Sequence, residues 1–431
     1  MFPSPLGVPV VSEPEIRRAR RAVSAVFAVH GAVAATFATR IPWIKGNLHL
    51  DAGELGIALM APAIGSSLAM PLAGRLVHAR GHRSAVRLLI SLWCLALALP
   101  ALAPDLPVLV VCLLVFGACA GTADVAMNAQ GVEVERRHGR SIMSGLHGMW
   151  SVGGLAGSAV GVLAASLGWD ARWHLAGMAV LLAGLGVLAS RGLLDVRSAP
   201  DAEAPPRFAL PPRSAWAIGM VGFCAVFAEG ASGDWSGVYL RGTAGASAGV
   251  AAASYTAFAC MMAVSRLSGD AAVRRLGPVR AVRVGGVVAA LGGVLVVVSR
   301  TPVPAILGFA LLGIGIAVVV PLCFAAAGHS GDNPSRAIAG VATVTYTSGL
   351  LAPATIGWVA QAASLPVSFA LVTILTLGLV FGAPVLAPVV ARSGPGGDGG
   401  GGGGAIEAAG AVAAPGTGQT SGTGDNIGLI G

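Results

Sequence analysis

The chain has 431 residues, of which 55% are apolar and only 11% are charged, and its formal net charge is +8. A soluble globular protein carries roughly 25% charged residues, so this composition, with a mean hydropathy of +0.79, predicts an integral membrane protein. The positive residues lie in short stretches between apolar segments, as expected of a membrane protein. No basic stripe of the kind that binds nucleic acid is present, so no nucleic-acid partner is expected.

Runs of about 20 apolar residues, the length that crosses a bilayer, predict twelve transmembrane helices in an all-α fold: 22–43, 52–77, 85–103, 107–130, 141–167, 172–190, 214–239, 247–268, 281–299, 303–327, 337–360 and 366–390. The first run follows four arginines, and the many later spans favour a retained helix over a cleaved signal peptide. Residues 1–21 are predicted to be a cytoplasmic lead, 191–213 a Pro-rich charged cytoplasmic linker, and 391–431 a disordered Gly-rich tail.

The lysines and arginines are distributed unevenly between the two sides of these spans. Twenty-two of the 27 lie on the side that includes both termini, and five lie on the other side: Arg40, Lys45, Arg172, Arg241 and Arg300. By the positive-inside rule, both termini are predicted to be cytoplasmic.

An internal repeat relates the two halves of the chain. An offset of 196 residues pairs Gly81 with Gly277 and Trp150 with Tyr346, at equivalent places in the predicted spans. Two six-helix bundles, 22–190 and 214–390, joined by a central linker, form an architecture typical of transporters, whose site lies at the midplane between the halves.

The sequence contains no motif for nucleotide hydrolysis and no pattern for metal binding. The chain's single lysine, Lys45, precedes Gly46 and Asn47, so no Walker A motif is present. The six cysteines form no CxxC pair or zinc-type spacing, so no metal site is predicted. No cofactor is expected; an ion gradient, substrate flow or another subunit would supply the driving energy.

The stretch Gly117–Arg140 carries the most informative polar residues. Asp124 and Asn128 are four residues apart, so they share one face of a helix. A carboxylate at membrane depth is costly and is retained where it faces a cavity, a partner or a substrate. Asp124 is therefore the first candidate for proton coupling and Asn128 for substrate binding, against the alternative of a structural acid paired to a neighbouring helix.

Two further acids and one arginine lie within the spans. Glu229 is a second proton-coupling candidate or, alternatively, the partner of Arg40 or Arg241 in an outer salt bridge. Asp234 lies nearer the outer end of its span, which favours a gating or rim role. Arg40 is expected to gate, to pair with Asp234, to bind an anionic substrate or to snorkel to the interface.

Histidines and aromatic residues complete the candidate substrate site: His30, His147, Trp150, Tyr346 and Trp235. Either histidine can relay protons because histidine titrates near neutral pH, and the aromatic rings can stack on a sugar or an aromatic ligand. The alternatives are hydrogen bonding between helices for the histidines and packing or interface anchoring for the aromatic residues.

The loop after the second span, Gly74 to Arg83, resembles the signature loop of the major facilitator superfamily, with His78 where an aspartate is usual. Its counterpart in the second half runs from Arg266 to Gly277, and the twelve-span layout agrees with that family. The resemblance implies a two-bundle fold and gating roles for Arg80, Arg83, Arg266 and Asp270. Glu133 and Arg136, after the fourth span, are expected to lie in a solvated loop with inner-gate salt bridges.

Other motifs resemble a narrower branch of the superfamily, the YbjJ-like bacterial inner-membrane transporters related to the fucose:proton symporters. They are Thr39-Arg40-Ile-Pro42, Ala123-Asp124-Val-Ala-Met-Asn128, His147-Gly148, Ala228-Glu229-Gly230 and Asp234-Trp235-Ser236. The resemblance implies an inner-membrane location and a proton-coupling role for Asp124.

Together these features predict a monomeric secondary transporter that moves a small polar, sugar-like solute through the lipid bilayer by alternating access, with proton coupling. Proton-driven efflux of a lipophilic compound is the alternative, although Gly153-Gly154-Leu-Ala-Gly157-Ser lacks the proline of the antiporter signature. A non-transporting membrane sensor is a further alternative; it would need a large regulatory domain or a partner-binding tail, and the Gly-rich tail offers neither. An enzyme is not expected, because no nucleophile, base and orienting group occur together within the spans.

Overall fold

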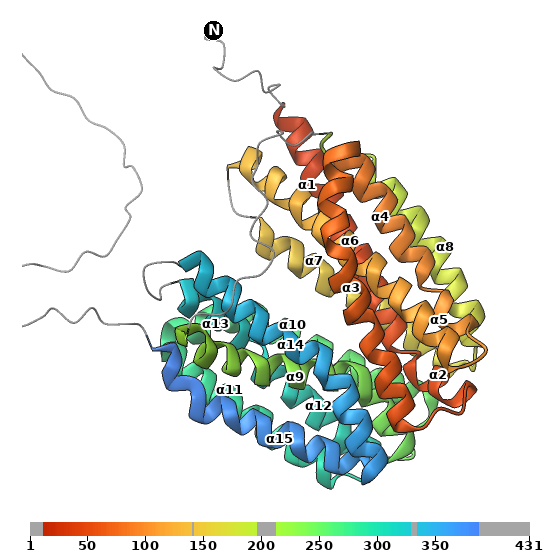
Figure 1. The fold of residues 1–431 in the computed structure, drawn as a ribbon, viewed down its shortest axis with the longest axis vertical. Helices are drawn as coiled ribbons and strands as arrows, with labels where there is room; N and C mark the ends of the chain where they lie inside the picture. The colour runs from red at the N-terminus through yellow and green to blue at the C-terminus, as the bar shows by residue number, and fades with distance from the viewer. Residues whose placement is uncertain (1–11, 140–141, 196–212, 329–333, 388–431) are drawn as a thin grey trace, which may run out of the picture. The chain divides into compact units, whose positions relative to one another are not determined.

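The structure is a computed structural model that describes residues 12–139, 142–195, 213–328 and 334–387. These residues form fifteen α-helices and one short 3-10 helix, with no strand among them (Figure 1). Eleven segments are long and apolar enough to cross a membrane, which confirms the all-α membrane class. The remaining predicted span, 337–360, corresponds to α14 (Pro334–Ala362), whose 29 residues exceed the ~20 that a crossing needs.

The N-terminal half contains α1 (Glu13–Ala38), α2 (Ile41–Asn47), α3 (Ala52–Arg80), α4 (His82–Ala96), α5 (Leu99–Leu102), α6 (Leu106–His138), α7 (Met143–Ser166) and α8 (Ala171–Ser190). The C-terminal half contains α9 (Arg213–Gly242), α10 (Ala248–Leu276), α11 (Pro278–Val298), α12 (Pro302–Ile316), α13 (Val319–Gly328), α14, α15 (Leu365–Gly382) and η1 (Ala383–Leu386). Most of the predicted linker 191–213 and all of the predicted tail 391–431 lie outside the described residues.

Several predicted helix boundaries are wrong, and local capping explains two of them. The first helix begins at Glu13 instead of near residue 22, because the Ser12 backbone N–H donates to the Glu15 carboxylate at 2.9 Å and caps the helix start. The fourth predicted span continues to His138, so Glu133 and Arg136 lie on a helix and not in a loop. That helix stops at Gly139, whose φ of +68° is a conformation that glycine adopts at low cost.

The internal repeat is visible in the backbone. A single glycine joins α3 to α4 and, 196 residues later, α10 to α11: Gly81 has φ +77° and Gly277 has φ +75°. Glycine tolerates this region because it has no β-carbon. In each half, the second and third predicted spans are therefore joined by the same turn, made by one glycine.

The two halves meet mainly through two helix pairs, α3 with α14 and α7 with α10, and α2 also contacts α9 and α10. In the repeat, α3 corresponds to α10 and α7 corresponds to α14. The internal repeat therefore relates the two contacts to each other. A β-carbon on Gly56 would lie 2.8 Å from the Pro353 carbonyl oxygen, and one on Gly249 would lie closer still to the Ser166 hydroxyl oxygen. Both contacts lie towards the helix ends predicted to be extracellular, so the halves pack closely there.

Candidate functional site

Asp124 and Asn128 meet on α6 as their spacing predicts. The Asn128 Nδ2 donates to the Asp124 carbonyl oxygen at 2.9 Å and to its Oδ1 at 3.1 Å. Both residues are half-buried. Among the described side chains, no lysine or arginine forms an ion pair with Asp124. The hydrogen-bond partner of this carboxylate is therefore a neutral amide.

His30 connects three helices beside this acid. The Trp150 Nε1 on α7 donates to His30 Nδ1 at 3.1 Å, and His30 Nε2 lies 3.4 Å from the Ala120 carbonyl oxygen on α6. An indole N–H only donates, so Nδ1 accepts, Nε2 carries the proton, and His30 is neutral in this arrangement. Trp93 stacks on the ring with 5.2 Å between centroids.

Asp124 lies close enough to His30 to act on it electrostatically. Asp124, Asn128, His30 and Trp150 therefore form one group, which we call the N-terminal polar cluster. His147 is exposed on α7 and contacts Phe27 edge-on at 5.3 Å between ring centroids. The structure thus brings together four of the residues that the sequence singles out, from α1, α6 and α7.

Glu229 on α9 has a partner that the sequence analysis did not anticipate. The Arg266 guanidinium on α10 lies 3.2 Å from each Glu229 carboxylate oxygen, and the Arg266 and Glu229 side chains are 39% and 35% exposed. Arg266 also donates to the Ala317 carbonyl oxygen at 3.4 Å. The alternative of a salt bridge from Glu229 to Arg40 or Arg241 is wrong in this conformation.

Tyr255 on α10 is a further residue that sequence reasoning missed. It lies near both Glu229 and Asp234, and its ring approaches Gly233 on α9. The chain has only three tyrosines, and this rarity in an apolar span was the one available signal. Tyr255 places a hydroxyl-bearing ring beside the two acids of the C-terminal half.

Three other candidates are buried or lie outside the described side chains. Trp235 is fully buried, and its indole nitrogen has no hydrogen-bond partner among the described atoms. It packs inside the C-terminal half in this conformation. The side chains of Tyr346 and Asp270 lie outside the described residues.

Arg40 is buried inside the N-terminal half. Its Nε donates to His174 Nδ1 on α8 at 3.0 Å, and both residues are less than 5% exposed. The predicted pair of Arg40 with Asp234 is not formed, because Arg40, at the junction of α1 and α2, bonds to His174 on α8 instead. His174 is a second residue that sequence reasoning missed, since nothing in its spacing points to Arg40.

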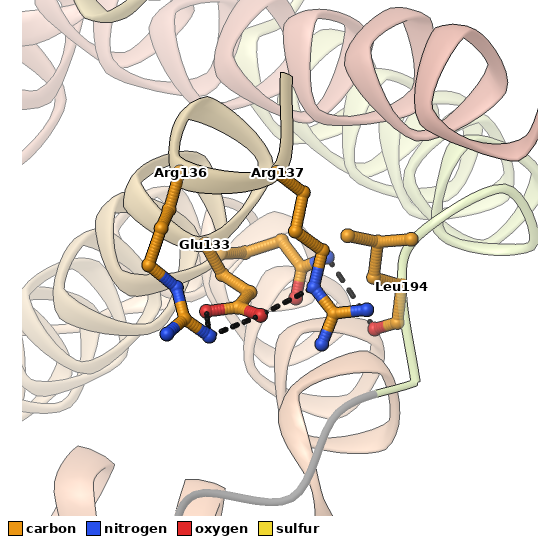
Figure 2. A network of polar contacts seen from close by, with 5 residues as sticks. Glu133, Arg136, Arg137 and Leu194 are labelled. Carbon is orange, nitrogen blue, oxygen red and sulfur yellow. Dashed lines mark hydrogen bonds and ion pairs between the residues drawn. The ribbon is translucent and has the colours of Figure 1, made fainter. Parts of the chain in front are cut away.

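The end of α6 that is predicted to be cytoplasmic carries a compact set of ion pairs. Figure 2 shows Glu133 between Arg136 and Arg137. The Glu133 carboxylate lies 2.9 Å from Arg136 Nη2 and 2.6 Å from Arg137 Nε. These pairs join residues of one helix and one half. Gln130 Nε2, earlier on the same helix, donates to the Leu194 carbonyl oxygen at 3.4 Å. The hydrogen bond from Gln130 to Leu194 is the contact that joins this end of α6 to the segment after α8.

The signature-loop arginines lie at the start of α4 and the end of α3. Arg83 donates to the Arg191 carbonyl oxygen at 2.7 Å, and Arg80 is exposed at the last residue of α3. In this conformation Arg83 ties α4 to the end of α8 within the N-terminal half.

An all-helical chain with two repeated halves and polar clusters in both defines a multi-pass membrane transporter. Comparison with known proteins identifies the family of this chain. The profile of the Major Facilitator Superfamily matches residues 23–353. An uncharacterized transporter of Sinorhizobium fredii is 33% identical over 85% of this chain and 97% of its own length, and an uncharacterized MFS-type transporter of Yersinia pestis is 36% identical over 81% and 91%.

The chain therefore belongs to the Major Facilitator Superfamily, and it is a transporter that works by alternating access and not an enzyme. The crystal structure of the nucleoside transporter NupG superposes with a TM-score of 0.68 over 86% of this chain and 98% of that one, at 12% identity. This likeness supports the fold. The narrower YbjJ-like branch stays a prediction.

Proposed function

We propose that this protein is a proton-coupled symporter that imports a small polar, sugar-like solute across the cytoplasmic membrane, as a monomer with both termini in the cytoplasm. Asp124 is the proton site, and Asn128, His30 and Trp150 bind solute beside it. The proposal depends above all on one observation: Asp124 is paired to a neutral amide and to no described cation. Such a carboxylate can gain a proton without breaking an ion pair.

The position of Asp124 links its protonation to the movement of helices. It acts on His30, which hydrogen-bonds to α6 and α7. Neutralising Asp124 changes the field at this junction of α1, α6 and α7, and α7 is also a helix that contacts the other half. A change of charge at Asp124 is therefore passed to an interface that must open and close during alternating access.

The C-terminal half contributes through Glu229. Its ion pair with Arg266 holds α9 to α10. The helix α10 in turn contacts α7 of the N-terminal half. Protonation of Glu229 would release that pair. We assign Glu229 an assisting role, in which the pair opens during the conformational change.

The experiment uses the full-length protein in liposomes that contain the pH-sensitive dye pyranine. Neutral sugars, sugar acids and polyols are added outside one at a time, and symport acidifies the interior. The radiolabelled form of any active solute is then accumulated against a gradient. Asp124→Asn is expected to abolish accumulation while solute exchange across the membrane persists.

The matched control is Asp105→Asn, because Asp105 caps the start of α6 and asparagine caps equally well. It should accumulate solute normally. Undiminished accumulation by Asp124→Asn would contradict proton coupling at this residue. Proton release driven by lipophilic cations, with no response to sugars, would replace the proposal with proton-driven efflux.

A further inference from the structure

A cavity of about 810 Å³ lies between the two halves at the helix ends predicted to be extracellular. We call it the outer cavity. Its lining includes Pro42, Lys45 and Ala52 from the N-terminal half and Arg241, Arg300 and Ser364 from the C-terminal half. Its volume falls in the range of roughly 300–1,000 Å³ that small-molecule sites occupy.

The charged residues described in the lining of the outer cavity are all positive. Lys45, Arg241 and Arg300 line it, and no described aspartate or glutamate does. The two acids near this end of α3, Asp51 and Glu54, cap that helix by hydrogen bonds to each other's backbone N–H groups. The described wall of the cavity therefore carries three formal positive charges and no carboxylate.

Each of the three cations is held in place by backbone carbonyl groups. The Lys45 Nζ donates to the Leu50 carbonyl oxygen at 2.6 Å and the Arg241 Nη1 to that of Ala246 at 2.9 Å, and Arg300 donates to carbonyls at the end of α11. These bonds use one nitrogen of each arginine, and a guanidinium has five N–H donors. The described residues thus leave the arginines with donors available for a ligand.

This convergence is unusual for the chain. Only five of its 27 lysines and arginines lie on the predicted outer side, and three of them meet in this cavity. A fourth, Arg40, shares an adjoining cavity of about 290 Å³ with Arg241, and its buried Nη2 has no hydrogen-bond partner among the described atoms. The positive-inside rule disfavours lysine and arginine on the outer side. A function in binding a ligand would explain why these residues gather at the outer cavity.

We propose that the outer cavity is the entry site for an anionic solute, a small polar molecule that carries a carboxylate or a phosphate. Clefts lined by one sign of charge raise the local concentration of the opposite charge, and an arginine fork matches the geometry of both anions. The inference rests on the proposed function, because it treats the outer cavity as the route to the N-terminal polar cluster. It narrows the sugar-like substrate to a sugar acid or a sugar phosphate.

The test measures the melting temperature of the full-length protein in neutral detergent at fixed ionic strength, because screening would mask a weak anion site. The probes are D-glucuronate, D-glucose 6-phosphate and D-glucose. A ligand that binds the folded state raises the melting temperature by mass action. An anionic probe should raise it in a concentration-dependent way, and D-glucose should do so at least about tenfold less potently.

Arg300→Gln is the principal variant. Among the described residues Arg300 donates hydrogen bonds only to carbonyls at the end of the preceding helix, α11, so its loss should leave folding intact. The variant should weaken the response to the anionic probe about tenfold. Arg241→Lys keeps the charge but loses the fork, so it should weaken the response less than Arg300→Gln does. Arg172→Gln is the matched control, since Arg172 is on the same side but pairs with Asp170 at 3.7 Å and does not line the cavity; it should respond as the natural protein does.

Equal responses to D-glucose and the anions, no response to either anion, or an unchanged response in Arg300→Gln would overturn the inference. So would a rise in melting temperature produced by phosphatidylglycerol nanodiscs over phosphatidylcholine nanodiscs and by neither anion, because the site would then bind lipid. If a neutral sugar is accumulated, this accumulation requires Asp124, and neither anion binds, then only the inference about the outer cavity is refuted. Undiminished accumulation by Asp124→Asn is measured separately and refutes the proposed function alone.

Discussion

The N-terminal and C-terminal halves share a helical skeleton but differ in how each holds its central acid. Gly81 and Gly277 make the same turn at equivalent positions. Asp124 in the first half accepts a hydrogen bond from Asn128, whereas Glu229 in the second half forms an ion pair with Arg266. The two halves thus keep one frame while their polar chemistry differs.

This difference in partners is the basis for proposing different roles for the two acids. Asp124 forms no ion pair with a described cation, and this is why we propose it as the proton site. Protonating Glu229 sacrifices the attraction of Arg266, an interaction worth little at a solvated site and more when water is excluded. Glu229 is therefore better suited to hold α9 against α10 in one conformation and to release it in another.

The largest expected effect comes from reversing the charge of Arg266. Arg266→Glu places a second carboxylate beside Glu229, and like charges in contact cost several kcal/mol, so the initial uptake rate should fall by about 100-fold or more. The double variant Glu229→Arg with Arg266→Glu restores opposite charges and should recover at least part of the rate. Uptake by proteoliposomes measures both.

The control for this reversal is Arg17→Glu. Arg17 pairs with Glu13 at 3.1 Å on the exposed start of α1, so its reversal should leave uptake unchanged. If the swapped pair were as inactive as Arg266→Glu alone, the attraction between the residues would not be what transport needs. Glu229 would then act through its own carboxylate, as Asp124 is proposed to do.

The helical frame was largely predictable, because long apolar runs cannot leave their backbone groups unpaired in lipid and so form helices. The shared face of Asp124 and Asn128 was predictable for the same local reason, since a spacing of four residues is a property of the helix itself. The helix ends at Glu13 and Gly139 were missed because charged residues suggested a lead and a loop. Capping and a left-handed glycine, which act locally, decided both ends.

Contacts between helices were not predictable in the same way. Glu229 and Arg266 are 37 residues apart, and Arg40 and His174 are 134 apart. Whether such residues meet depends on the rotation and translation of one helix against another, which hydropathy leaves undetermined. Arg40 consequently had several possible partners from its position in the span, and the structure pairs it with a histidine of its own half.

The shared skeleton is tested by the two junction glycines. Gly81→Ala and Gly277→Ala each force a β-carbon into a backbone region that L-residues avoid, at about 1–3 kcal/mol, so each should lower the thermal midpoint by a similar amount. Gly74→Ala is the control, because Gly74 lies within α3 and the space that a β-carbon would take there is open; it should leave stability unchanged or slightly raised. A fall for only one junction would show that the halves do not rely on equivalent turns.

The smallest expected effect separates solute binding from proton coupling within the N-terminal polar cluster. Trp150→Phe keeps an aromatic ring but removes the N–H that donates to His30 Nδ1 at 3.1 Å. A lost hydrogen bond of about 1 kcal/mol corresponds to roughly a fivefold rise in KM for uptake. Because Asp124 is untouched, the steady accumulation ratio should stay the same, and Trp173→Phe, which changes a ring that is 82% exposed, should alter neither quantity. A fall in the accumulation ratio would instead place the contact between Trp150 and His30 in the proton path, and the proton site of the first half would then extend from α6 across α1 to α7.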